Sequence, residues 1–197
     1  RIPNHPIASK LLESLNFPLA APSANIATKI SSTHPSHLSD ELKKNTYILE
    51  GGSSTLGLES TVIQTIKDEI KILRLGSITI EELKDKFSHS KITVANFDSK
   101  LSPGNQKKHY SPNLPIRLNV LEVHKNESLL NFGSNNLKSL ICEYNLSPNH
   151  DLNEASKNFF NYLYLIDKTE CAGIAVAPIP NYGLGKTIND RLIRASS

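Results

Sequence analysis

A break in composition divides this 197-residue chain and constrains how it can fold. Residues 98–115 are rich in Ser, Pro, Gly, Asn, Lys and His and contain almost no aliphatic side chains, which is typical of a linker. On each side of the break, short apolar runs alternate with segments of helical periodicity. The sequence therefore predicts two α/β units, residues 1–97 and 116–197, joined by the linker 98–115.

The first unit, residues 1–97, combines helical and strand signals. Apolar spacing and N-cap residues predict helices over 5–15, 33–42 and 79–87. The last of these begins with a capping box, because Thr79 is followed by Glu82. Short apolar runs predict strands over 17–21, 46–49, 60–66 and 70–74.

The second unit, residues 116–197, repeats the alternation. Strands are predicted over 116–120, 137–142 and 172–177, and helices over 151–166 and 187–195. The run 172–177 is entirely apolar, as is typical of parallel strands that are buried on both faces. We therefore expect a small Rossmann-like α/β domain after the linker.

Composition narrows the class of protein further. No apolar run approaches the roughly 20 residues that a membrane span needs. The single cysteines Cys142 and Cys171 fit neither a disulfide framework nor a paired-Cys zinc site, so a cytoplasmic protein without redox chemistry is expected. A net charge of +3 is too mild to identify a nucleic-acid binder. The chain begins at Arg1 and contains no Met, so we expect a segment upstream of it.

The stretch 51–62 is the strongest local candidate for a binding site. Its glycines precede Ser60 and Thr61, and such a loop can bring backbone and hydroxyl donors close to a polyanionic ligand. A plain strand-to-strand turn is the alternative, but a turn requires neither Gly57 nor the hydroxyl pair. Glu59 is either a catalytic base or, as is more common for a carboxylate without a partner, a structural residue.

Histidines elsewhere give weaker signals. His34 and His37 share a predicted helix face, yet no further ligand is close in sequence, so no metal site is predicted. His109 lies in the linker beside Tyr110, and we interpret it as a residue that orients its neighbours rather than one that transfers protons.

Several motifs in a fixed order resemble the YrdC-type threonylcarbamoyl-AMP synthases. They are Arg1-Ile2-Pro3 with His5-Pro6, Ala21-Pro22-Ser23-Ala24-Asn25, Gly57-Leu58-Glu59-Ser60-Thr61-Val62 and Ile72-Leu73-Arg74-Leu75-Gly76. The linker with His109-Tyr110-Ser111-Pro112 and the later Asn189-Asp190-Arg191-Leu192 are similar to the long form of that family. The resemblance implies the C-terminal half of a twisted mixed-sheet α/β domain, then a linker and an additional C-terminal domain.

The resemblance also implies an activity. L-Threonine takes up bicarbonate on its amine, and the carbamate attacks the α-phosphate of ATP, which releases pyrophosphate and forms threonylcarbamoyl-AMP. A partner tRNA threonylcarbamoyl transferase uses this product to modify the adenosine beside the anticodon, and Mg²⁺ is expected with ATP. Such a reaction depends on positioning and charge neutralisation more than on acid–base groups.

Individual residues receive roles from the same resemblance. Contacts with L-threonine are implied for Arg1, Ala21 and Ser60. Contacts with ATP are implied for Ser23, Asn25, Ser31, Arg74 and Tyr110, the last of these as a lid. Support of the lid and loop is implied for Thr61, Lys108 and His109. The family's nucleotide clamp has no counterpart here, so we expect the chain to be an N-terminally truncated fragment that is inactive alone.

Two other functional classes stay open. A non-catalytic RNA-binding module is one, because the YrdC fold presents a concave basic face. Lys and Arg are spread through the chain without aromatic interleaving, which favours the enzyme and leaves weak RNA binding allowed. The other is a regulatory or partner-docking role for the residues from Ile116 onward.

Overall fold

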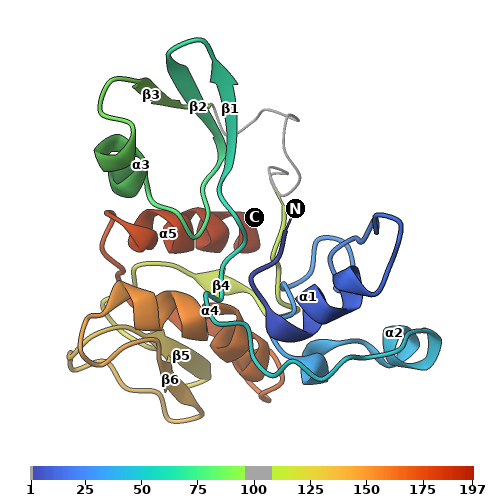
Figure 1. The fold of residues 1–197 in the computed structure, drawn as a ribbon. Helices are drawn as coiled ribbons and strands as arrows, with labels where there is room; N and C mark the ends of the chain where they lie inside the picture. The colour runs from blue at the N-terminus through green and yellow to red at the C-terminus, as the bar shows by residue number, and fades with distance from the viewer. Residues whose placement is uncertain (1, 96–107) are drawn as a thin grey trace.

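The computed structural model describes residues 2–95 and 108–197, which contain two separate sheets (Figure 1). A three-stranded sheet has the order β1-β2-β3, and a four-stranded sheet has the order β4-β7-β5-β6. The upper part of Figure 1 holds the first sheet with helix α3, and the lower part holds the second sheet with α4. Helix α5 lies between them in this view. The predicted mixed α/β class is confirmed.

The first sheet combines a predicted hairpin with a strand that was not predicted. β1 (Val62–Ile66) pairs antiparallel with β2 (Glu69–Arg74), which confirms the strands expected over 60–66 and 70–74. β3 (Lys91–Val94) then pairs parallel with β2. The intervening helix α3 (Ile80–Lys86) has the expected capping box, in which Thr79 and Glu82 each accept a hydrogen bond from the other's backbone N–H.

Two strands predicted in the first unit are wrong. Residues 17–21 and 46–49 adopt no strand conformation, and Phe17 and Tyr47 are largely or fully exposed. A strand needs a neighbour for its N–H and C=O groups. In the part of the chain that the structure describes, no strand pairs with either segment.

The helices of this unit follow the predictions in part. α1 (Pro6–Glu13) confirms the helix expected over 5–15 and is capped by the His5 side chain. The helix expected over 33–42 is wrong as a single element, because it divides into η1 (Pro35–His37) and α2 (Asp40–Asn45). Leu38 between the two is extended, and the Ser39 hydroxyl then caps a new helix start.

The second sheet is parallel throughout. It consists of β4 (Ile116–Arg117), β5 (Glu127–Asn131), β6 (Glu143–Asn145) and β7 (Gly173–Val176). Every residue of β7 is buried, which confirms the strand predicted over 172–177. The strand predicted over 137–142 is wrong, because pairing with β5 begins at Glu143. Before it, the Ser139 hydroxyl accepts from the N–H groups of Ile141 and Cys142 and holds a turn instead.

Two helices complete the second unit, and its core extends beyond it. α4 (Leu152–Ile166) begins after Asp151 as expected, and α5 (Leu184–Ala195) contains the predicted helix 187–195. Phe159 and Phe160 of α4 lie at the centre of the main core. That core also includes Ile30, Leu58 and Tyr110, so loops of the first unit and the end of the linker pack against α4 and α5.

Candidate functional site

Gly57 anchors the glycine stretch directly on α4. Its φ of +73° lies in the left-handed region, and a Cβ there would come within 2.1 Å of the Ser156 carbonyl oxygen. The Ser156 hydroxyl donates to the Leu56 carbonyl at 3.1 Å, and Leu58 enters the core. Only glycine permits this backbone-to-backbone approach. The anchor fixes where Glu59 and Ser60 leave the loop.

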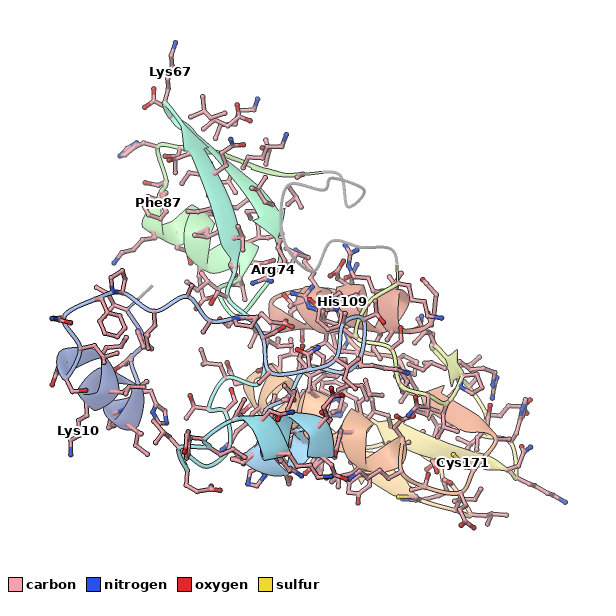
Figure 2. The ribbon with its side chains drawn as sticks, turned by 90° about the vertical axis from the view of Figure 1, so that its right-hand side faces the viewer. Lys10, Lys67, Arg74, Phe87, His109 and Cys171 are labelled. Carbon is pink, nitrogen blue, oxygen red and sulfur yellow. The ribbon has the colours of Figure 1, made fainter. Side chains whose placement is uncertain are left out.

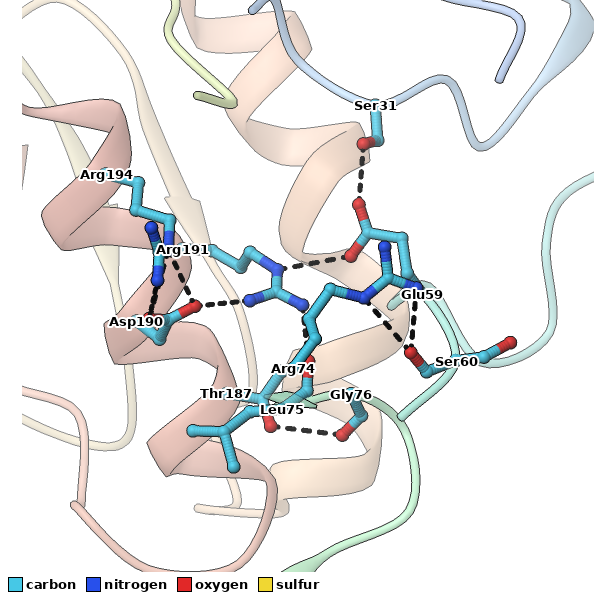
Figure 3. Close-up of polar contacts among 10 residues, drawn as sticks. All are labelled: Ser31, Glu59, Ser60, Arg74, Leu75, Gly76, Thr187, Asp190, Arg191 and Arg194. Carbon is cyan, nitrogen blue, oxygen red and sulfur yellow. Dashed lines mark hydrogen bonds and ion pairs between the residues drawn. The ribbon is translucent and has the colours of Figure 1, made fainter. Parts of the chain in front are cut away.

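Glu59 is the centre of a polar cluster that joins three parts of the chain (Figure 3). One carboxylate oxygen accepts from the Ser31 hydroxyl at 2.8 Å, and the other accepts from Arg191 Nε at 3.2 Å. Burial raises the pKa of Glu59, but the Arg191 charge and the Ser31 hydrogen bond outweigh it and hold the pKa below 4.5. Glu59 is therefore ionised and paired, which favours the structural interpretation over that of a catalytic base.

Arg191 reaches this cluster from α5, and its side chain is fully buried. Its NH2 group donates to the Leu75 carbonyl at 2.5 Å, and its NH1 group pairs with Asp190. Its guanidinium carbon also lies 4.9 Å from the centre of the Tyr110 ring. Cations are seldom fully buried unless they are paired, and this one has a partner for each side of its planar fork.

Arg74 and Ser60 meet at the end of the first sheet. Arg74 donates to the Ser60 carbonyl from Nε at 3.3 Å and from NH2 at 2.8 Å. The Thr61 hydroxyl donates to the Ile78 carbonyl at 2.6 Å and so fastens β1 to the loop after β2. The Ser60 side chain is drawn pointing away from the Arg74 guanidinium (Figure 3).

Tyr110 lies inside the molecule rather than over an open site. It is 1% exposed, packs near Phe160 and has a φ of +61°. Burial raises its pKa to about 12, with the nearby Arg191 charge acting in the opposite direction. A lid contact with a nucleotide would require the ring to leave this position, so its ATP role stays a prediction.

The His109 ring lies tilted against Tyr110, with ring centroids 4.0 Å apart, and the His109 backbone N–H donates to the Arg194 carbonyl at 3.2 Å. Figure 2 shows His109 and Arg74 in the same central region of the molecule. Burial lowers the pKa of His109, Glu59 raises it, and the charges of Arg191, Arg194 and Arg74 lower it further. Its buried Nδ1 has no hydrogen-bond partner among the described residues.

The remaining predicted residues lie apart from this cluster. Ala21 and Ser23 are exposed, as is Lys108. The Asn25 amide donates to the Ile26 and Lys29 carbonyls, which closes its own turn. Arg1 lies outside the described residues. The structure thus brings Ser31, Ser60, Thr61, Arg74, His109 and Tyr110 toward one cluster around Glu59.

The α5 residues of the cluster carried no predicted role. Asp190, Arg191 and Arg194 complete it, with Asp190 accepting from Arg194 Nε at 3.1 Å. The available signal was the Asn189-Asp190-Arg191-Leu192 run, in which Arg191 lies on the same side of the helix as the apolar Ile188 and Leu192.

Metal and membrane features are limited. Within residues 2–95 and 108–197, no group of three or more His, Cys, Asp or Glu side chains is placed to hold a metal ion. Each helix that the structure describes is too short or too polar to traverse a bilayer.

The fold and the cluster define a class: a mixed α/β protein with arginines and hydroxyl groups gathered where its two halves meet. Two family models match the chain. The one described as "Telomere recombination" covers residues 1–76, and the one described as "Threonylcarbamoyl-AMP synthase, C-terminal domain" covers residues 78–197. The chain belongs to the threonylcarbamoyl-AMP synthase family.

Individual relatives agree with this assignment. The threonylcarbamoyl-AMP synthase of Pyrococcus abyssi is 29% identical over all of this chain and 63% of its own length. That of Bacillus subtilis is 26% identical over all of this chain and 62% of its own length. The enzyme of Schizosaccharomyces pombe is 37% identical over 61% of this chain and 32% of its own length. The chain therefore spans less than two thirds of the length of these relatives.

Solved structures show the same similarity. The crystal structure of P. abyssi Sua5 complexed with L-threonine has a TM-score of 0.79 and 27% identity over all of this chain and 63% of that chain. A variant of the same protein with a consecutive histidine and tyrosine replaced by alanine has a TM-score of 0.76, 26% identity and coverage of all of this chain and 60% of that one.

Proposed function

We propose that this chain carries part of an L-threonylcarbamoyladenylate synthase, which joins L-threonine, bicarbonate and ATP into threonylcarbamoyl-AMP and pyrophosphate. The observation that carries the proposal is family membership over both halves of the chain together with the polar cluster around Glu59. L-Threonine is bound in the related P. abyssi structure, which supports an amino-acid substrate here.

The cluster suits this chemistry because the substrates carry negative charge on phosphate and carboxylate oxygens, and further charge develops on the pyrophosphate that leaves. Arg74 donates to the Ser60 carbonyl, and we assign Arg74 to ATP and Ser60 to L-threonine. Ser23, Asn25 and Ser31 are proposed ATP contacts, and Arg1 and Ala21 proposed L-threonine contacts. Thr61 supports the loop through Ile78.

His109 and Tyr110 are assigned to the lid, with Lys108 beside them. This chain has a single consecutive His-Tyr pair, at these positions. The P. abyssi variant shows that such a pair has been altered in a relative. Movement of Tyr110 out of the core would bring its ring and the polar face of His109 toward a nucleotide.

Mg²⁺ would enter with the ATP phosphates, since this ion retains several waters and needs few protein ligands. A tRNA threonylcarbamoyl transferase would consume the product, and weak RNA binding by the complex is part of the proposal. We place the activity in the cytoplasm. We also propose the division into 1–97, 98–115 and 116–197, with the parallel sheet β4-β7-β5-β6 and its crossover helix α4 as the Rossmann-like domain.

The test is pyrophosphate release by the protein expressed from its full reading frame. Release should require L-threonine, bicarbonate and ATP together, and omission of any one should abolish it. Release that continues without L-threonine would contradict the proposal.

A further inference from the structure

We propose that Arg191 is a positioning residue through which helix α5 sets the geometry of the substrate site. Its buried guanidinium fixes the Ser60, Arg74 and His109–Tyr110 segments relative to one another (Figure 3). The identity of the substrates rests on the proposed function. The positioning itself is a property of the fold that can be tested separately.

The contacts of Arg191 fall on the immediate sequence neighbours of two predicted substrate residues. Nε donates to Glu59, which precedes Ser60, and NH2 donates to the carbonyl of Leu75, which follows Arg74. Each contact lies one residue along the chain from Ser60 or Arg74, so it restrains the segment that carries that residue. A single guanidinium therefore holds both ends of the Arg74–Ser60 contact.

The third contact restrains the end of the linker. The Arg191 guanidinium carbon lies 4.9 Å from the Tyr110 ring centre, within the range of a cation–π interaction. The Arg194 backbone carbonyl, on the same helix, accepts from the His109 backbone N–H. Displacement of Tyr110 would therefore remove one partner of the cation that holds Glu59 and Leu75.

Packing alone does not require this arginine. The α5 residues Ile188 and Leu192 are 0% and 2% exposed and already attach the helix to the core. A buried cation carries a large desolvation cost, and replacing the whole of a buried ion pair by apolar residues is often neutral or stabilising. Arg191 lies where three segments of the substrate site meet. We attribute its presence to holding these segments in place rather than to attaching the helix.

Arginine is specifically suited to this role because its fork reaches several acceptors in one plane. A lysine would keep the charge and could pair with Glu59, but its ammonium could not bridge Glu59, Asp190 and Leu75 in the same way. Arg191→Lys therefore separates the charge from the geometry. Arg191→Met removes both while keeping much of the apolar stem.

The experiment measures amide hydrogen exchange of the full-reading-frame protein in three segments, 58–62, 73–76 and 109–112. Arg191→Met should accelerate exchange at least tenfold in all three and leave β5 and β7 unchanged, and Arg191→Lys should do so partially. Arg117→Met is the control, since it removes an arginine that pairs with Glu127 through Nε and NH2 at the four-stranded sheet, away from the three segments. The control should leave the three segments unaltered.

Two exchange results would overturn the inference: a uniform rise that includes β5 and β7, which indicates a purely structural role, or no rise in the three segments. If Arg191→Met fails to fold, Arg191→Lys decides alone. In parallel, pyrophosphate release by Arg191→Lys should lose kcat at least tenfold with a smaller change in KM, because ground-state contacts remain. Failure of the unaltered protein to release pyrophosphate would reject the proposed function and leave the exchange result intact.

Discussion

Replacing Gly57 by alanine should destabilise the protein far more than the same change at Gly52. Both glycines have positive φ, +71° at Gly52 and +73° at Gly57, so both variants bear a left-handed alanine that costs roughly 1–2 kcal/mol. At Gly52 a Cβ meets nothing within 4 Å. At Gly57 it would lie 2.1 Å from the Ser156 carbonyl oxygen and 2.6 Å from Lys157 Cα.

Those contacts at Gly57 are with helix backbone, which cannot rotate away as a side chain can. The loop must retreat from α4, and forced movement of this kind adds about 1–3 kcal/mol. Gly57→Ala should therefore lose about 2–5 kcal/mol in total, and Gly52→Ala about 1–2 kcal/mol. The two variants share the backbone strain, so the difference between them isolates the close approach.

The assay is urea unfolding followed by far-UV circular dichroism, with both variants and the unaltered protein measured under one condition. Midpoints should fall in the order unaltered, Gly52→Ala, Gly57→Ala, with similar slopes. Equal midpoints for the two variants would show that the loop is not held against α4. A larger loss at Gly52 would refute the reasoning altogether.

Two further predictions concern titration. Tyr110 has a folded-state pKa of about 12 against an ordinary 10.0, so the stabilisation from its neutral phenol is present below pH 10.0 and lost as the pH rises toward 12. Ultraviolet titration should show a late tyrosinate step that Tyr110→Phe lacks; an unchanged curve would contradict this. Glu127 has a pKa of about 2 against 4.5, mainly because Arg117 donates to it, so its stabilisation is present above pH 4.5 and lost as the pH falls toward 2. The melting temperature of Glu127→Gln should fall less over that window, and an equal fall in both proteins would reject the assignment.

Sequence signals predicted the elements whose cause is local. The α3 capping box lies within four consecutive residues, and the apolar run of β7 reports burial directly. Both signals act through the backbone or the immediate neighbours, so no knowledge of the tertiary fold is needed.

Elements stabilised by distant partners were missed. β5 is fully buried, yet it contains Glu127, Ser128 and Asn131, and such a polar composition is typical of an exposed segment. Glu127 is paired with Arg117, and the Asn131 amide donates to Glu143 of the neighbouring strand. Those partners come together only when the sheet is assembled, so no strand was predicted over 127–131.

The same limit applied to the candidate site. Motifs identified Ser60, Arg74 and Tyr110 because each lies in a short recognisable string. The Glu59–Arg191 pair joins residues 132 positions apart, and arginine is among the residues least often buried. Spacing in the sequence carries no information about such a pair, and the structure was needed to show that α5 completes the cluster.

The glycine stretch now divides into two parts with different roles. The left-handed backbone of Gly57 packs directly on the α4 backbone, so it is not available to approach a ligand. Gly51 and Gly52 instead border a pocket of about 490 Å³ that Ser53, Ser54 and Thr55 also line. Anion binding stays a prediction for Gly52 and Ser53, whereas the Ser54 N–H already donates to the Thr33 carbonyl. Gly57 fixes the loop on α4 between this pocket and Glu59. A substitution in α4 that displaces Gly57 should therefore shift both the pocket residues and Glu59.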